Sequence, residues 1–280
     1  MGIQAFSDHS NYLDRMAKSL NESTKSLIPL YIKGKKKVLD VGCADGSMMQ
    51  KLMENDTNIE VYGIDLCQES IDICESKGLK VFKSDINSFV HTTGLKFDAI
   101  IFSSVLHEIS SYADKDKYSI FHIEVALNNA KKILTDDGIV IIRDGLGTND
   151  YRAVPFQFVN NEDYKIAREF VRTPVFSGHP WTINMCTKDR YTVTMSRRDF
   201  KEFLFTYTWG EKSWERESKE RFGIMSVEEW IQTVKDVGFN IKFISTSTEQ
   251  YIERLKEKVI CDKLEEVLAE CTITMILSKE

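Results

Sequence analysis

The segment 38–46, Val-Leu-Asp-Val-Gly-Cys-Ala-Asp-Gly, is the part of the sequence that most constrains the fold. A short apolar run ends in an acid, a loop of small residues bounded by Gly42 and Gly46 follows, and residues 47–54 can form a helix. This order predicts a strand, a tight turn and a helix N-terminus, which present backbone N–H groups and a helix dipole to a ligand. The two glycines are also compatible with a simple turn between a buried strand and a helix.

Two kinds of phosphate-binding loop do not fit this segment. No Gly-Lys-Ser/Thr closes the loop, which excludes a nucleoside triphosphate loop. The nicotinamide dinucleotide pattern Gly-x-Gly-x-x-Gly is not matched either, because Ala44 stands where the second glycine would be. Asp40, at the end of the strand, would repel a pyrophosphate and suits a ligand that carries a positive charge or an amine.

Four further apolar runs predict strands that alternate with helices, at 59–66, 80–83, 97–103 and 138–142. This alternation predicts an α/β protein with a doubly wound parallel sheet and helices on both faces. Asp65 ends the second strand about 20 residues after the glycine turn, where an acid binds ribose hydroxyls in doubly wound folds. Asp85, after the third strand, could accept a hydrogen bond from an adenine amino group while Ile86 packs on the ring.

Residues 38–145 resemble the core of the class I S-adenosylmethionine-dependent methyltransferases, a Rossmann-like family. The segment 40–46, Asp-x-Gly-x-Ala-x-Gly, matches the cofactor loop of that family, and Asp65 matches its ribose-binding acid. Ser-Asp-Ile at 84–86 matches the adenine-side position, and Leu-Thr-Asp-Asp-Gly at 134–138 matches a turn usually written with Pro-Gly-Gly. The departures are an alanine for the middle glycine of the loop and Asp-Asp for Pro-Gly.

The resemblance implies a mostly parallel, seven-stranded sheet whose last strand is antiparallel. It also implies S-adenosyl-L-methionine as the cofactor and S-adenosyl-L-homocysteine (SAH) as the product. The ammonium and sulfonium charges of this cofactor suit the acids near the loop, and its carboxylate suits the backbone N–H groups. The implied cofactor-binding residues are Asp40, Gly42, Ala44, Gly46, Asp65, Leu66, Asp85, Ile86 and Ser103.

The composition of the 280 residues is that of a soluble globular protein, with 42% hydrophobic and 29% charged residues. The N-terminus shows no signal-peptide pattern, and no apolar run approaches the roughly 20 residues that a membrane helix needs. We therefore expect a cytoplasmic protein without a membrane partner. The six cysteines lack a Cys-x-x-Cys spacing, which favours free thiols and predicts no metal site. The net charge of −6 weighs against general binding to nucleic acid.

The strand pattern predicts four parts of the chain. A helix over 10–31 belongs to an N-terminal helical segment, 1–36, and the cofactor-binding core follows over 37–145. Residues 146–225 form an inserted substrate or lid subdomain, because a compact domain does not carry about eighty structureless residues. Residues 226–280 complete the core sheet, with a helix, a strand, a helix and a last strand at 226–237, 239–245, 256–268 and 272–277.

The insert differs from the core in composition. It holds three of the four prolines and three of the four tryptophans, and the segment 203–210 is rich in aromatic residues. Between residues 188 and 221, nine Lys or Arg residues stand against seven acids. We interpret the insert as a helical lid with its own aromatic core. The alternative is an RNA platform, in which rings stack on bases and cations bind phosphates, but the surplus of positive charge is small.

His107 and Glu108 follow the fourth strand, beside the site expected for the transferred methyl group. A histidine is the natural base for a hydroxyl or amine acceptor, and the alternative is that His107 packs and caps the next helix. Arg143 and Asp144 end the fifth strand, where they could contact substrate or form a salt bridge with each other. We predict catalytic roles for His107, Glu108 and Arg143, and substrate contacts for Asp144, His179, Trp181 and Tyr207.

The predicted function is transfer of a methyl group to an oxygen or nitrogen of a small-molecule or peptide acceptor bound under the insert. Residues 103–106 are Ser-Ser-Val-Leu, where family members that methylate base amines carry Asn/Asp-Pro-Pro-Tyr/Phe, so we do not expect methylation of a base amine. No Pro-Cys follows the fourth strand, which argues against carbon methylation through a cysteine adduct. The alternatives are an RNA methyltransferase, a protein that binds the cofactor without catalysis, and a nicotinamide oxidoreductase.

Overall fold

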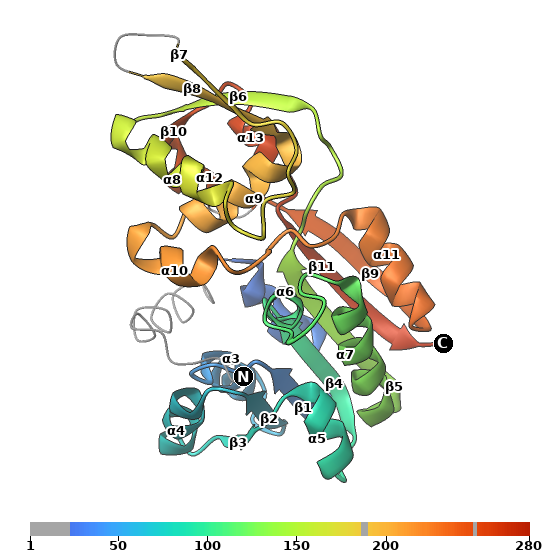
Figure 1. The fold of residues 1–280 in the computed structure, drawn as a ribbon. Coiled ribbons are helices and arrows are strands. Elements are labelled where there is room, and N and C mark those ends of the chain that lie inside the picture. Colours follow the sequence, from blue (N-terminus) through green and yellow to red (C-terminus); the bar gives the residue numbers. More distant parts are fainter. Residues whose placement is uncertain (1–22, 186–189, 249–250) are drawn as a thin grey trace. The chain divides into compact units, whose positions relative to one another are not determined.

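The computed structural model describes residues 23–185, 190–248 and 251–280 (Figure 1). The chain divides into two compact units. The first unit comprises the described residues up to Asp144, together with Glu229–Ser245 and Ile273–Glu280. The second unit comprises Gly145–Glu228 and Thr246–Thr272.

The first unit is built on a sheet of seven described strands in the order β3-β2-β1-β4-β5-β11-β9. Strands β1 to β5 are parallel to one another, and the last strand, β11, is antiparallel. The predicted doubly wound, mostly parallel sheet is therefore confirmed. The strands are β1 Lys37–Val41, β2 Glu60–Asp65, β3 Lys80–Lys83, β4 Phe97–Ser103, β5 Leu134–Gly145, β9 Phe239–Ser247 and β11 Thr272–Lys279.

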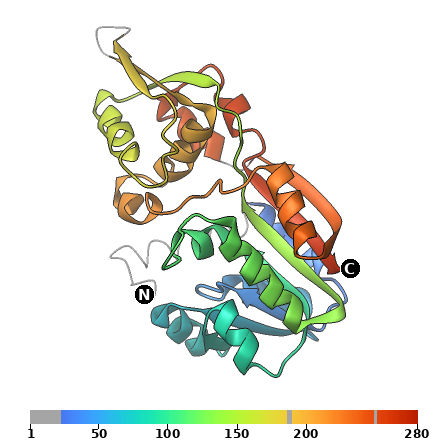
Figure 2. The same ribbon diagram turned by 45° about the vertical axis from the view of Figure 1, so that its right-hand side comes forward.

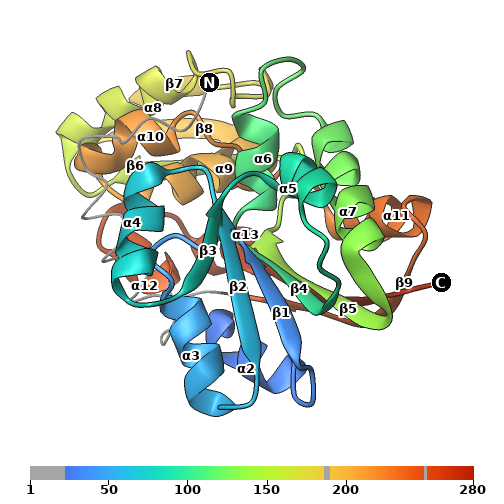
Figure 3. The ribbon, with the colours of Figure 1, turned by 90° about the horizontal axis from the view of Figure 1, so that it is seen from below.

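Helices cover both faces of this sheet. Helices α2, α3 and α4 share a buried apolar cluster with β1, and Figure 3 shows α2 and α3 on the face opposite α5 and α7. Helix α7 packs along α5 and α6 (Figure 2). The helices are η1 Thr24–Leu27, α2 Ile28–Tyr31, α3 Ser47–Asn55, α4 Gln68–Ser76, α5 Ile86–Thr92, α6 Leu106–Ser111, α7 Ile120–Ile133 and α11 Val227–Asp236.

The central strands form the core of the first unit. Their sequences are nearly continuous apolar runs because helices bury both faces of a parallel sheet. In β4, Phe97, Ile100, Ile101 and Phe102 are fully buried. Strands β1 and β4 are neighbours, but the chain continues from β1 to β2 and β3 on one side and from β4 to β5 on the other. The strand order therefore reverses between β1 and β4. Doubly wound folds bind ligands at the carboxyl ends of the strands at such a switch point.

The second unit contains a four-stranded antiparallel sheet in the order β10-β6-β8-β7, with helices packed on it. An aromatic core joins β6 to α9, where the rings of Phe156 and Phe200 stack with centroids 4.1 Å apart. The strands are β6 Ala153–Phe158, β7 Thr182–Met185, β8 Tyr191–Ser196 and β10 Val259–Ile260. The helices are η2 Asn161–Asp163, α8 Tyr164–Phe170, α9 Arg197–Tyr207, η3 Glu211–Ser213, α10 Trp214–Glu217, α12 Tyr251–Lys256 and α13 Leu264–Leu268.

The prediction of a helical insert is wrong, because the second unit is a mixed α/β structure. Residues in β6 alternate between exposed and buried positions, a period-two pattern that marks a strand with one covered face. The predicted helix over 256–268 is also wrong. It is interrupted by β10, in which Val259 and Ile260 pair with β6.

Other boundaries differ from the prediction as well. Residues 246–272 group with the second unit, whereas the predicted division joins them to the core sheet. The segment 134–138, predicted as a turn, is the beginning of β5, where a register irregularity separates the pairing of Leu134 from that of Ile139. Residues 1–22 of the predicted N-terminal segment lie outside the described residues. Within the described ranges, none of the helices combines the length and apolar character that a membrane span requires.

Candidate functional site

The loop between β1 and α3 is held in a left-handed backbone conformation at three alternate positions. Gly42 has φ 73°, Ala44 has φ 48° and Gly46 has φ 77°. A Cβ atom on Gly42 would lie 2.7 Å from Cγ2 of Val105, and one on Gly46 would collide with Leu79. Only glycine fits at these two positions, while Ala44 adopts φ > 0 in spite of its side chain.

Asp65 ties this loop to the end of β2. Its Oδ2 accepts a hydrogen bond from the N–H of Ala44 at 3.0 Å, and its Oδ1 accepts one from the N–H of Cys67 at 2.8 Å. The loop contacts therefore fix the direction of the Asp65 side chain.

Asp40 is a buried acid at the end of β1, only 3% exposed. Burial raises the pKa of Asp40 to about 7, and the nearby charges of Asp65 and Asp45 act in the same direction. The charge of Lys25 opposes this rise of the pKa. A ligand cation beside Asp40 would favour the ionised carboxylate in the same way.

The ends of β2, β3 and β4 carry the other predicted cofactor residues. The Oγ atom of Ser103 is buried and has no hydrogen-bond partner among the described residues, so it is suited to a ligand. Asp85 caps α5, because its Oδ1 accepts from the N–H groups of Asn87 and Ser88 at 2.8 and 2.9 Å. Ile86 is buried, whereas Leu66 is exposed.

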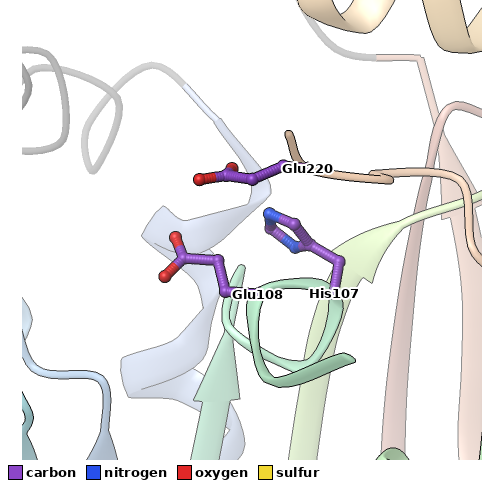
Figure 4. Close-up of side chains that lie close together, drawn as sticks. All are labelled: His107, Glu108 and Glu220. Carbon is purple, nitrogen blue, oxygen red and sulfur yellow. The ribbon is translucent and has the colours of Figure 1, made fainter. Parts of the chain in front are cut away.

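His107 and Asp144 form a buried pair. Nδ1 of His107 lies 2.6 Å from Oδ1 of Asp144, and Oδ2 accepts from the N–H groups of Leu106 and His107 at 2.9 and 3.2 Å. The carboxylate favours the proton on Nδ1, so that Nε2 is the basic nitrogen of the neutral ring. Glu108, half-buried, is the next residue of α6, and Figure 4 shows the His107 and Glu108 side chains at the start of that helix.

Arg143 bonds to two hydroxyl groups. Its Nε donates to Oγ1 of Thr24 at 3.1 Å, and its Nη1 donates to Oγ of Ser104 at 2.6 Å. Sequence reasoning missed Thr24 and Ser104, and Thr24 lies 119 residues from Arg143 in the chain. Ser104 could be found only by its φ of 60°, which a sequence does not display.

Two predicted roles need correction. Asp144 is fully buried and engaged with α6, so it orients His107 and is not placed as a substrate contact. Tyr207 is buried in the second unit, where its ring stacks on Phe203 and its hydroxyl donates to Oδ2 of Asp163 at 2.5 Å. Burial raises the pKa of Tyr207 above its usual range, with Asp163 as a further cause.

His179 and Trp181 also belong to the second unit. The ring of His179 lies against Tyr151, with centroids 3.9 Å apart. The indole Nε1 of Trp181 is buried without a hydrogen-bond partner among the described residues. Their substrate roles remain predictions.

Residues 23–115 match the family model described as methionine biosynthesis protein MetW, which covers well under half of the chain. A comparison with the curated proteins found no matching sequence.

Solved structures that share the fold include two plantazolicin methyltransferases and a pyocyanin biosynthetic protein. The plantazolicin methyltransferase BamL, in complex with a triazolic desmethylPZN analog and SAH, has a TM-score of 0.57 at 15% identity, over 98% of this chain and 90% of that chain. The plantazolicin methyltransferase BpumL in complex with SAH has a TM-score of 0.52 at 14% identity, over 97% and 89%. The pyocyanin biosynthetic protein PhzM has a TM-score of 0.55 at 10% identity, over 99% and 60%. The chain has the class I methyltransferase fold.

The carboxyl edge of this class I methyltransferase fold fits the expected cofactor. The loop presents its N–H groups at left-handed positions, Asp40 and Asp65 supply carboxylates, and Ser103 supplies a buried hydroxyl without a partner among the described residues. Acids suit an ammonium, a sulfonium and ribose hydroxyls, and they disfavour a phosphate. The donor set therefore agrees with S-adenosyl-L-methionine.

Proposed function

We propose that the protein is an S-adenosyl-L-methionine-dependent methyltransferase that acts on an oxygen or nitrogen of a small-molecule or peptide acceptor. The buried His107–Asp144 pair carries this proposal, because it provides an oriented base in a class I methyltransferase fold. Asp144 arises from the end of β5 and His107 from the helix after β4, and these strands are neighbours. A cytoplasmic location agrees with the composition and remains part of the proposal.

The proposed cofactor residues divide by chemistry. Asp40 would bind the ammonium group, the N–H groups of the glycine loop would bind the carboxylate, and Asp65 would bind the ribose hydroxyls. Asp85, Ile86 and Leu66 serve the adenosine side, and Ser103 offers a hydroxyl group. When bound, the cofactor supplies an electrophilic methyl group.

The residues of the chain then have two tasks at the acceptor. Nε2 of His107 takes the proton of an acceptor hydroxyl or amine, and Asp144 stabilises the imidazolium that forms. Glu108 is proposed to position the acceptor, and the acceptor contacts of His179 and Trp181, in the second unit, stay predictions. Holding the acceptor atom in line with the methyl group supplies much of the rate in such a reaction.

The RNA alternative loses the residues on which it depended. Phe203 and Tyr207 stack on each other in the core of the second unit, so their rings are not available to bases. Arg197 is paired with Asp150 and Glu266, and Arg198 bonds to Asn149 and Tyr151. A small-molecule or peptide acceptor is therefore favoured over RNA.

The test measures binding and turnover separately. We expect wild-type protein to bind SAH in isothermal titration calorimetry, and Asp65→Ala to abolish binding. His107→Ala should bind SAH normally and lose methyl transfer to a panel of hydroxyl and amine acceptors. His91→Ala, an exposed histidine on α5, is the matched control.

Each alternative has its own result in this experiment. Turnover by His107→Ala at the wild-type rate would show that His107 is not the general base. SAH binding without transfer to any acceptor of the panel would favour a cofactor-binding protein without catalysis. A thermal shift with a nicotinamide dinucleotide but none with SAH would favour an oxidoreductase.

A further inference from the structure

A contact between distant parts of the first unit has no task in the proposed proton transfer. Arg143, near the end of β5, is buried and donates to Thr24 in η1 and to Ser104 in the loop after β4. Both distances, 3.1 and 2.6 Å, are those of well-formed hydrogen bonds. One side chain therefore joins three segments at the carboxyl edge of the sheet.

Ser104 is held in an unfavourable conformation by this contact. Its φ of 60° lies in the left-handed region, which costs an L-residue free energy. Arg143 holds Ser104 twice, because its carbonyl oxygen accepts from the N–H of Ser104 at 2.7 Å and its guanidinium bonds the hydroxyl. The next residue, Val105, packs on Gly42. The conformation of Ser104 therefore determines how Val105 packs against the glycine loop.

The second partner, η1, lies near the acid at the end of β1. Lys25 follows Thr24, is buried, and its charge stabilises the ionised form of Asp40. Ile28, at the start of α2, is fully buried in the cluster that also contains Val38. The hydrogen bond from Arg143 to Thr24 therefore fixes the position of η1, which carries Lys25 close to Asp40.

We propose that Arg143 is a positioning residue that latches η1 and the Ser104 turn onto the carboxyl edge of the sheet, and so completes the wall of the cofactor site. The proposal rests on the proposed function for the identity of the ligand. Arg143 acts through its hydrogen bonds to Thr24 and Ser104. This replaces the catalytic role predicted for Arg143.

The latch is tested with SAH as the probe and with variants that remove its parts singly. We expect Arg143→Gln to weaken SAH binding roughly tenfold or more, since it removes hydrogen bonds from a charged donor. Thr24→Val should weaken binding less, and Thr24→Ser should restore it. Thr57→Val, at an exposed threonine, is the matched control. The double variant Thr24→Val/Arg143→Gln should bind no more weakly than Arg143→Gln alone.

Hydrogen exchange distinguishes a latch from general destabilisation. Without ligand, both Thr24→Val and Arg143→Gln should speed exchange in residues 23–31 and leave the amides of β1 and β4 protected. Equal acceleration throughout the sheet would overturn the proposal, and so would wild-type SAH affinity in Arg143→Gln or additive effects in the double variant.

Failure of the proposed function gives a different pattern. If the wild-type protein does not bind SAH, the function is wrong, and exchange in residues 23–31 alone decides whether the latch exists. If Arg143→Gln does not fold, Thr24→Val decides, because it removes one hydroxyl and no charge.

Discussion

Nδ1 of His107 lies 2.6 Å from Oδ1 of Asp144, and the other oxygen of that carboxylate accepts from the N–H of His107 itself. One acid thus fixes both the ring and the backbone from which the ring projects. Because α6 begins directly after β4 and Asp144 lies near the end of β5, adjacent strands of the sheet set the geometry of this pair.

This pairing predicts that Asp144 acts through His107. Asp144→Asn removes the charge that stabilises the imidazolium and can reverse the tautomer of the ring. We expect methyl transfer to fall about 100-fold or more, with unchanged SAH affinity in calorimetry. Asp72→Asn, on the exposed side of α4, is the control. Wild-type turnover in Asp144→Asn would show that the pair is structural only.

The left-handed conformation of Ala44 predicts an unusual substitution pattern. Ala44→Gly removes an αL penalty of about 1–2 kcal/mol and adds about 0.5–1 kcal/mol of chain entropy. We expect a small increase in the free energy of unfolding by urea denaturation. Gly46→Ala should lower stability and SAH affinity, because its Cβ collides with Leu79. The control is Gly94→Ala, whose Cβ meets open space; a large loss for Ala44→Gly would contradict this account.

The raised pKa of Asp40 predicts pH-dependent cofactor binding. With a pKa of about 7, the acid is partly protonated near neutrality, and a cationic ligand binds the ionised form. Affinity for S-adenosyl-L-methionine should therefore rise as the pH rises through 7, with release of a proton. Calorimetry between about pH 6 and 8, in buffers of different ionisation enthalpy, measures both effects. Asp40→Asn should abolish this dependence, and an unchanged slope would exclude Asp40.

The same group affects stability with a definite sign. The folded-state pKa of Asp40 lies above the value near 4 of an unfolded chain, so the folded state binds the extra proton between these values. The contribution of Asp40 to the free energy of unfolding should fall as the pH rises from about 4 towards 7. Comparing urea denaturation of wild type and Asp40→Asn across this range isolates that contribution.

We expect a substitution at Tyr207 to lower the stability of the protein without changing its activity. Tyr207→Phe removes the hydroxyl that donates to Asp163 and keeps the ring that stacks on Phe203. We expect a loss of about 1–3 kcal/mol in the free energy of unfolding and an unchanged KM for the acceptor. A raised KM at normal stability would restore the predicted substrate contact.

The parallel sheet could be predicted from the sequence because the patterns that indicate its strands are local. Each signal is contained in a few consecutive residues: the apolar runs of β1 and β4, the acids that end β1 and β2, and the glycine loop. The order of these local signals implies a doubly wound fold. His107 could be located for the same reason, since it follows β4 directly.

The remaining features depend on contacts between distant residues. Nothing near Asp144 shows that its carboxylate turns towards His107, 37 residues earlier, or that Arg143 reaches Thr24. The strands of the second unit were missed because β6 is short and carries a proline, Pro155. The aromatic segment 203–210, whose rings pack against β6, has the composition of a binding surface but forms part of the core of the second unit.

The chain passes between the two units four times, after Asp144, Glu228, Ser245 and Thr272. Neither unit is a continuous stretch of sequence, so a single cut cannot release either as an intact piece. Deletion of residues 146–225 alone would leave β10 behind without β6, its partner in the ladder. Transplanting the second unit onto a related scaffold therefore requires both of its segments, and chimeras joined at one boundary should expose an unpaired edge and aggregate.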